Sequence, residues 1–317
     1  MRTVYQADFP EQPVPSYETY REELQLPTSI LGPRRMWVAR SDGVVVATAT
    51  VVFPQPENEN LTITTVRVPP AQRRRGIGTA LLGAVLPAMR AANRTLVTGQ
   101  GLIDGRAGQL WAAHLGFSPV QEFRLQDLRI PDIDPELWQV PAPAGFGVER
   151  WVDAAPDDIV ERYATARTAI TDAPVADSSL RQPTWTVERV RAHEAEAAER
   201  GSELWVVAAV HEATGAVAGL TEIELPAMRS HQAYQLDTAV PAEFRGHGLG
   251  RFIKAAMLRW LTAERPQLEW VYTNTDAHNV HMIRVNRQVG YVDKEVVLDV
   301  EADLDTLDKR LRPSTGQ

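Results

Sequence analysis

The sequence contains no cysteine among its 317 residues. Disulfides, thiolate metal sites and a cysteine nucleophile are therefore excluded. It also has no apolar run near the length of a membrane span, and its first residues lack the apolar stretch of a signal peptide. We accordingly expect a cytoplasmic protein that has no membrane partner.

An excess of positive charge is absent as well. The formal net charge is −8, which argues against broad nucleic-acid affinity, because such binding needs a basic surface that displaces counterions. The negative charge mildly favours a cationic substrate such as an amine. A content of 44% hydrophobic and 23% charged residues is typical of a globular protein, and the length predicts two domains.

The most informative stretch covers residues 233–254. Residues 233–240 are rich in β-branched and aromatic side chains, which predicts a strand, and apolar residues from Leu249 onward recur at helical spacing. Between them lies Arg245-Gly-His-Gly-Leu-Gly250, whose glycines permit unusual backbone dihedrals and close approach of a ligand. Because a helix N-terminus favours anions, this strand, turn and helix predict a site for a phosphate-bearing ligand.

The same pattern occurs a second time. Arg73-Arg-Arg-Gly-Ile-Gly78 also follows a strand pattern and precedes an apolar helix, 172 residues before the turn that begins at Arg245. Gly43–Pro54 aligns with Gly215–Pro226 at the same offset of 172, and a Gly-Phe pair answers a Gly-Tyr pair at 174. The matches indicate an internal duplication, so the chain carries two copies of one domain.

Arg245–Gly250 resembles the Arg/Gln-x-x-Gly-x-Gly/Ala signature of the GNAT superfamily of N-acetyltransferases, whose loop cradles the pyrophosphate of coenzyme A. The resemblance implies acetyl-CoA as cofactor and an α/β fold of two tandem GNAT domains, each a mixed, mostly antiparallel sheet flanked by helices. We assign residues 1–130 to a degenerate N-terminal domain that opens with a strand over Arg2–Gln6. The proline-rich residues 131–145 are predicted as a linker, and residues 146–317 as the C-terminal domain.

The resemblance also implies which residues hold the cofactor. Asn279 falls on the family's asparagine, whereas Asn286 replaces the tyrosine that often protonates the departing thiolate. Water, another group or a tyrosine such as Tyr272 must then act as the acid, or the thiolate leaves unprotonated. The first copy has Gly105 and Ala112 at these two positions, so both polar groups are missing there. The expected cofactor-binding residues are Thr238, Val240, Arg245, Gly246, His247, Gly248, Leu249, Gly250, Asn279 and Asn286 in the second copy, and Val66, Val68, Arg73, Arg74, Arg75, Gly76, Ile77 and Gly78 in the first.

Two carboxylates distinguish the copies further. Glu222 and Asp237 fall opposite Thr50 and Thr65 of the first copy. Acyl transfer to an ammonium needs a base that removes a proton, and carboxylates on inner strands are candidates for this role. The competing interpretations are a solvated Glu222 and an Asp237 that pairs with an arginine. We therefore predict catalysis in the second copy, with an acceptor pocket that includes the Asp172–Asp177 loop.

The predicted function is acetyl-CoA-dependent N-acetylation of a primary amine, in a small molecule, by direct attack on the thioester. One alternative is a CoA-binding regulatory or structural protein without turnover, and another is an acyltransferase that uses a longer acyl-CoA. No metal is expected, because His278 and His281 have no cysteine or carboxylate at ligand spacing.

Overall fold

The computed structural model describes residues 2–8, 14, 16–18, 21, 28–29, 32–54, 57–172, 177–227 and 229–312. The chain forms two compact units that do not follow a single cut through the sequence. Unit 1 comprises Met1–Phe123, Val175–Arg181 and Val296–Gln317, and unit 2 comprises Arg124–Pro174 and Gln182–Glu295.

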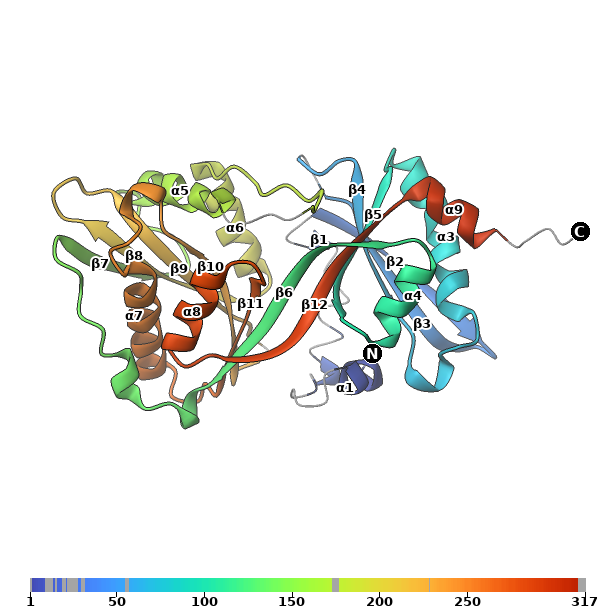
Figure 1. Ribbon diagram of the computed structural model, residues 1–317, viewed down its shortest axis with the longest axis horizontal. Helices are drawn as coiled ribbons and strands as arrows, with labels where there is room; N and C mark the ends of the chain where they lie inside the picture. The colour runs from blue at the N-terminus through green and yellow to red at the C-terminus, as the bar shows by residue number, and fades with distance from the viewer. Residues whose placement is uncertain are drawn as a thin grey trace, which may run out of the picture. The chain divides into compact units, whose positions relative to one another are not determined.

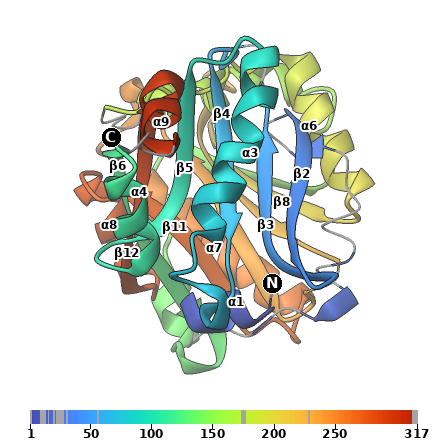
Figure 2. The same ribbon diagram turned by 90° about the vertical axis from the view of Figure 1, so that its right-hand side faces the viewer.

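Unit 1 is built on a mixed sheet in which β4 and β5 are parallel and the other neighbouring strands are antiparallel. Its helix α3 lies across this sheet over β3 and β4 (Figure 2). In order across the sheet, the strands are β1 (Thr28–Ser29), β2 (Gly32–Ser41), β3 (Val44–Val52), β4 (Leu61–Arg67), β5 (Leu96–Ile103) and the end of β12 (Val292–Asp303). The helices are α1 (Arg2–Asp8), η1 (Pro70–Gln72), α3 (Ile77–Ala91), α4 (Ala107–His114) and α9 (Leu304–Leu311).

Unit 2 repeats this plan, with β10 and β11 as its parallel pair. Its strands are, in order across the sheet, β6 (Ser118–Arg129, within the unit from Arg124), β11 (Trp270–Asp276), β10 (Gln232–Ala239), β9 (Val217–Leu225), β8 (Glu203–His211) and β7 (Phe146–Val152). Its helices are η2 (Ile130–Asp132), η3 (Pro135–Trp138), α5 (Val160–Arg167), η4 (Thr168–Asp172), α6 (Val187–Glu199), η5 (Ala242–Phe244), α7 (Leu249–Glu264) and α8 (Val280–Gln288). The predicted α/β class with mixed, mostly antiparallel sheets is confirmed.

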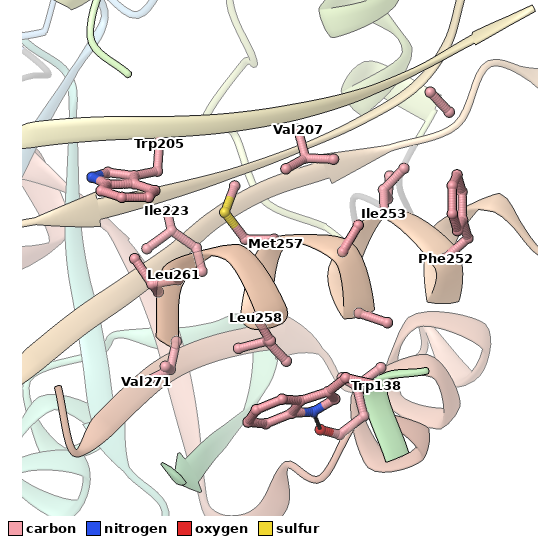
Figure 3. Close-up of a cluster of buried hydrophobic side chains, with 14 of the residues drawn as sticks. Trp138, Trp205, Val207, Ile223, Phe252, Ile253, Met257, Leu258, Leu261 and Val271 are labelled. Atoms are coloured by element: carbon pink, nitrogen blue, oxygen red, sulfur yellow. Dashed lines mark hydrogen bonds between the residues drawn. The ribbon is translucent and has the colours of Figure 1, made fainter. Parts of the chain in front are cut away.

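The sheet of unit 2 is covered by helices on both faces. Successive residues of β8 point to opposite sides of the sheet, so they pack against different helices. Trp205 and Val207 pack against α7, together with Ile223 of β9 (Figure 3). Val206 and Ala208 instead pack in the cluster formed with α5 and α6. These two helices cover the other face of the sheet (Figure 1). Burying each large apolar side chain stabilises the unit by about 1.5–3 kcal/mol, so the two layers hold the strands of the candidate site in place.

The unit boundaries differ from the predicted domains. β12 pairs with β5 through Val297–Asp303, so the C-terminal end of the chain completes the sheet of unit 1. The predicted linker belongs to unit 2, where Trp138 is 3% exposed. Its indole nitrogen donates a hydrogen bond of 2.8 Å to the Val289 carbonyl (Figure 3). The prediction of a strand over Arg2–Gln6 is wrong, because these residues lie in α1.

Candidate active site

The second glycine turn has the geometry of an anion site. Gly248 is the N-cap of α7 with a φ of 77°, and Gly246 has a φ of 84°, which side chains other than glycine adopt at a cost. A Cβ atom added at either glycine would meet nothing within 4 Å, so the space in front of the turn is open. No side chain caps the helix, and the N–H groups of its first turn have no acceptor within it. The turn therefore fits a phosphate group.

Arg245 shapes this turn from within. Its Nε donates a hydrogen bond of 3.0 Å to the carbonyl of Val240, which closes the loop between strand and helix. His247 also belongs to the turn, with its Nδ1 3.1 Å from the Phe244 carbonyl oxygen, while Leu249 is buried at 1% exposure. Three of the predicted cofactor residues thus hold the turn in shape, and the glycines provide its open face.

The parallel strands beside the turn separate before they reach it. β10 and β11 pair from Gln232 with Trp270 to Tyr234 with Tyr272, and the pairing ends there. On its other side, β10 shifts register against β9 before Thr238, as at a β-bulge. A bulge disrupts the ladder and re-aims backbone groups. An extended ligand laid along the separated edge would therefore meet main-chain groups of β10 near Thr238.

The two predicted asparagines differ in their surroundings. Asn279 caps α8, because its side-chain oxygen accepts a hydrogen bond of 3.1 Å from the Met282 N–H. The cap uses the side-chain oxygen of Asn279 and does not use its side-chain nitrogen. Asn286 is 1% exposed, and its Nδ2 donates to Gln126 Oε1 at 2.7 Å and to Thr275 Oγ1 at 3.0 Å. Asn286 is thus bonded within the interior of unit 2.

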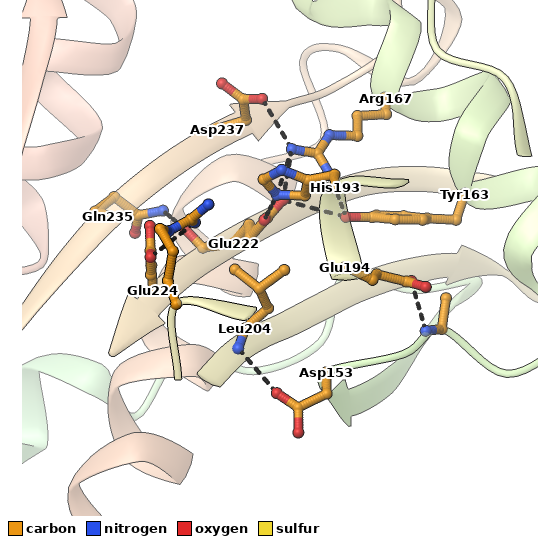
Figure 4. Close-up of polar contacts among 12 residues, drawn as sticks. Asp153, Tyr163, Arg167, His193, Glu194, Leu204, Glu222, Glu224, Gln235 and Asp237 are labelled. Atoms are coloured by element: carbon orange, nitrogen blue, oxygen red, sulfur yellow. Dashed lines mark hydrogen bonds and ion pairs between the residues drawn. The ribbon is translucent and has the colours of Figure 1, made fainter. Parts of the chain in front are cut away.

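Glu222 is the centre of a buried polar cluster (Figure 4). Its carboxylate is fully buried and forms an ion pair of 2.8 Å with Arg167. It also lies 2.7 Å from His193 Nε2 and accepts a hydrogen bond of 3.2 Å from the Tyr163 hydroxyl. Burial alone would raise the pKa of Glu222, but Arg167, His193 and Tyr163 together outweigh it and lower the pKa. The alternative of a solvated Glu222 is wrong, and a carboxylate held in this way is poorly suited to accept a proton.

Asp237 lies at the open side of the same cluster. Its Oδ2 is 3.5 Å from the Arg167 guanidinium (Figure 4), as the alternative interpretation anticipated. However, a third of the Asp237 side chain is exposed. Desolvation raises the pKa of Asp237, Arg167 opposes this, and the neighbouring Glu222 charge adds to the rise, so that the net pKa is raised. Asp237 is therefore the more basic and more accessible of the two predicted carboxylates.

Sequence reasoning missed the partners of these carboxylates. Tyr163 and Arg167 lie four residues apart on α5, and His193 lies on α6. Arg167 also stacks on Trp185, with 3.6 Å between its guanidinium carbon and the ring centroid. The spacing of Tyr163 and Arg167 places them on one helix face, which was the available signal. Residues 173–176 of the predicted acceptor loop lie outside the described residues.

Comparison with known families decides the assignment. The model of the acetyltransferase (GNAT) family matches residues 1–117, and that of an acetyltransferase (GNAT) domain matches residues 149–292. The chain belongs to the GNAT family. It is a tandem-domain N-acetyltransferase enzyme that uses an acyl-CoA donor. The comparison with curated proteins finds no match.

Solved structures agree with the tandem arrangement. A tandem GNAT protein from the clavulanic acid biosynthesis pathway is 25% identical, with a TM-score of 0.79 over 96% of this chain and 92% of its own. A GCN5-related N-acetyltransferase from Sphaerobacter thermophilus is 16% identical, with a TM-score of 0.72 over 96% of this chain and 90% of its own. The second likeness shows the fold alone.

The glycine turn of the first GNAT copy differs from that of the second. Arg74 takes the place of Gly246 and has a φ of 63°, which is strained for a residue with a side chain. Arg73 donates to the Val68 carbonyl at 3.0 Å, as Arg245 does to Val240, but it also pairs with Asp8 of α1 at 3.1 Å. A carboxylate on this arginine would compete with a phosphate.

The remaining predicted residues of the first copy build the same kind of turn. Gly76 is the N-cap of α3 with a φ of 75°, and Arg75 bonds the side chain of Gln72. Strands β3 and β4 pair in regular register from Thr48 with Arg67 to Val52 with Ile63, so this copy lacks the bulge of β10. Val66 packs against the core of unit 1, Ile77 opens α3, and Gly78 lies against Val68 and Trp111.

In the described part of the chain, no helix is long and apolar enough to cross a membrane. The same residues contain no group of three or more His, Cys, Asp or Glu side chains that could hold a metal ion.

Proposed function

We propose that the protein transfers the acetyl group of acetyl-CoA to a primary amine of a small molecule, and that catalysis takes place in unit 2. One observation carries this proposal: in unit 2, an open glycine turn, a bulged strand and an exposed carboxylate occur together. In unit 1 the equivalent arginine pairs with Asp8, the strand is regular and Thr65 takes the place of Asp237.

The residues of unit 2 have separate roles in this proposal. The amides of the Gly246–Gly250 turn bind the pyrophosphate at the positive end of α7. Main-chain groups of Thr238 and Val240 bind the pantetheine arm at the separated edge of β10, and the side-chain nitrogen of Asn279 adds a contact. Acetyl-CoA supplies a thioester whose carbonyl carbon accepts the amine. Backbone N–H groups at the bulge are the proposed donors that polarise this carbonyl.

Asp237 is the proposed base that takes the proton from the incoming ammonium, directly or through a water molecule. Its raised pKa makes it a better proton acceptor than Glu222, whose pKa is lowered. Glu222 instead holds Arg167 and His193 in place around Asp237. Asp237 presents an exposed carboxylate at this cluster, which favours a cationic acceptor.

The test is a panel of primary amines assayed with acetyl-CoA and with longer acyl-CoA donors. Asp237→Asn is expected to lower kcat/KM about 10²- to 10⁴-fold, because it removes the base. The matched variant Thr65→Ala, at the equivalent position of unit 1, is expected to retain full activity. Unchanged activity of Asp237→Asn, or a loss in Thr65→Ala alone, would contradict catalysis in unit 2.

A second candidate function is favoured by one observation. Asn286 replaces the family's usual acid and is bonded in the interior, which is compatible with a CoA-binding protein that has lost turnover. In that case the protein binds acetyl-CoA but acetylates no amine of the panel. A measurable rate that Asp237→Asn removes would exclude this candidate.

A further inference from the structure

Lys254 of α7 is a lysine buried in the interior of unit 2. It is 2% exposed, and its Nζ lies 3.5 Å from the Thr238 hydroxyl. The ammonium also lies over the ring of Tyr291, 5.3 Å from the centroid. No carboxylate among the described residues comes within ion-pair distance of it. A buried charge without a partner of opposite sign is costly, so a reason other than stability is needed for this residue.

The first copy shows that the fold does not require a lysine at this place. The residue 172 positions earlier is Leu82, which is 1% exposed in the core of unit 1. Val66 likewise takes the place of Thr238. The positions of Lys254 and Thr238 therefore have polar side chains only in the second copy, which also has the open glycine turn and the exposed Asp237.

Thr238 connects Lys254 to the edge of the sheet where the cofactor arm is expected. It lies on β10 beyond Tyr234, the last residue that pairs with β11, and directly after the register shift. Its hydroxyl is also 2.8 Å from the hydroxyl of Thr221. A single hydroxyl group thus separates the ammonium from the β10 edge on which, under the proposed function, the thioester rests.

We propose that Lys254 supplies the proton to the departing thiolate of coenzyme A through the Thr238 hydroxyl. The assignment rests on the proposed function and fills the role that Asn286 cannot perform. As the amine nitrogen bonds to the acetyl carbon, the carbon–sulfur bond breaks and sulfur keeps the electron pair. Lys254 passes a proton to the Thr238 oxygen while Thr238 passes its own proton to sulfur. The products are free CoA thiol and neutral Lys254, which solvent protonates again.

The acidity of Lys254 suits this role. Burial lowers the pKa of Lys254 from 10.5 to about 7, so it can hold and release a proton near neutral pH. Among the described residues, the titratable side chain in contact with the ammonium is Tyr291. Burial raises the pKa of Tyr291, so this neighbour stays uncharged while Lys254 titrates.

The experiment titrates the thiol of bound CoA by the ultraviolet absorbance of its thiolate, with no acceptor present. Below about pH 7 the protonated Lys254 is a nearby cation that favours the thiolate, so at about pH 6.5 the thiolate fraction of bound CoA in the wild type should exceed that of free CoA by about tenfold or more. Lys254→Met should abolish this increase, and Lys309→Met, at an exposed position of α9, should retain it. Thr238→Val is expected to reduce the increase, whereas Thr238→Ser retains it.

Turnover supplies the second readout. Lys254→Met should lower kcat by about 10²-fold with little change in KM, and remove any fall in kcat above about pH 7. CoA binding with equal thiol acidity in wild type and Lys254→Met would overturn the role of Lys254 alone. Absence of CoA binding would refute the proposed function as well. Acetylation of Lys254 itself by acetyl-CoA, detected by mass spectrometry, would overturn the proton transfer in favour of a nucleophile.

Discussion

Replacement of Lys254 by methionine should make the protein more stable, and by an amount that depends on pH. The fall in the pKa of Lys254 from 10.5 to about 7 corresponds to about 5 kcal/mol in favour of the neutral amine. Below pH 7 both folded and unfolded chains carry this proton, so the folded state bears the whole cost of a buried charge. Methionine has a similar shape and no charge, so it avoids this cost.

The sign of the pH dependence follows from proton uptake. Between pH 7 and 10.5 the unfolded chain holds a proton that the folded chain has lost, so the stability of the wild type rises with pH. The advantage of Lys254→Met over the wild type should therefore shrink by about 3 kcal/mol from about pH 6 to about pH 9.5. An advantage that does not change with pH would show that the Lys254 ammonium is solvated.

The assay is urea unfolding of both proteins at the two pH values, followed by the linear extrapolation of the unfolding free energy to water. Lys309→Met is the control, because Lys309 is exposed on α9. Its difference from the wild type should stay within about 0.5 kcal/mol at both pH values. A comparable pH dependence in this control would assign the effect to general charge and not to burial.

Four further substitutions test other parts of the structure. Arg74→Gly should stabilise the protein by about 1 kcal/mol, because glycine adopts the left-handed backbone conformation at this position without strain. Gly246→Ala should destabilise the protein by a similar amount for the opposite reason. A higher melting temperature for Gly246→Ala than for Arg74→Gly would contradict both predictions. Arg167→Met leaves Glu222 buried without its cation, so urea unfolding should show a loss of about 3–5 kcal/mol, and a loss under about 1 kcal/mol would mean that the cluster is solvated. Trp138→Ala should cost about 3–5 kcal/mol by the same assay, whereas a linker residue would cost almost nothing.

The glycine turns were predictable because their determinants are local. An arginine and two glycines at fixed spacing, a strand before them and an apolar helix after them suffice to locate such a turn, and Gly76 and Gly248 both have the left-handed geometry that the pattern requires. The duplication could also be read from the sequence, because matching segments recur at an offset of 172 residues. The structure agrees, since both copies separate their parallel strands after three paired residues.

Features set by long-range contacts could not be predicted. The pattern of β12 identifies a strand but does not say which sheet it joins, and the pairing with β5 at Val297–Asp303 depends on packing across the chain. The strand prediction over Arg2–Gln6 followed from its threonine, valine and tyrosine. There, tertiary context overrides propensity, since α1 carries the Asp8 that pairs with Arg73.

The candidate site was predictable in part. Glu222 and Asp237 stood out because the first copy has threonines at their positions. Their partners could not be found in this way, because Arg167 and His193 lie on helices whose contact with β9 and β10 is tertiary. The structure separates the two candidates, since the pKa of Glu222 is lowered, whereas the pKa of the more exposed Asp237 is raised.

The most direct test of catalysis in unit 2 is a calorimetric titration of the protein with acetyl-CoA. Gly248→Ala and Gly76→Ala form a matched pair, because the two glycines have φ values of 77° and 75° and both face open space. We predict one binding site, lost in Gly248→Ala and retained in Gly76→Ala. Two sites in the wild type, or one site that Gly76→Ala abolishes, would contradict this account.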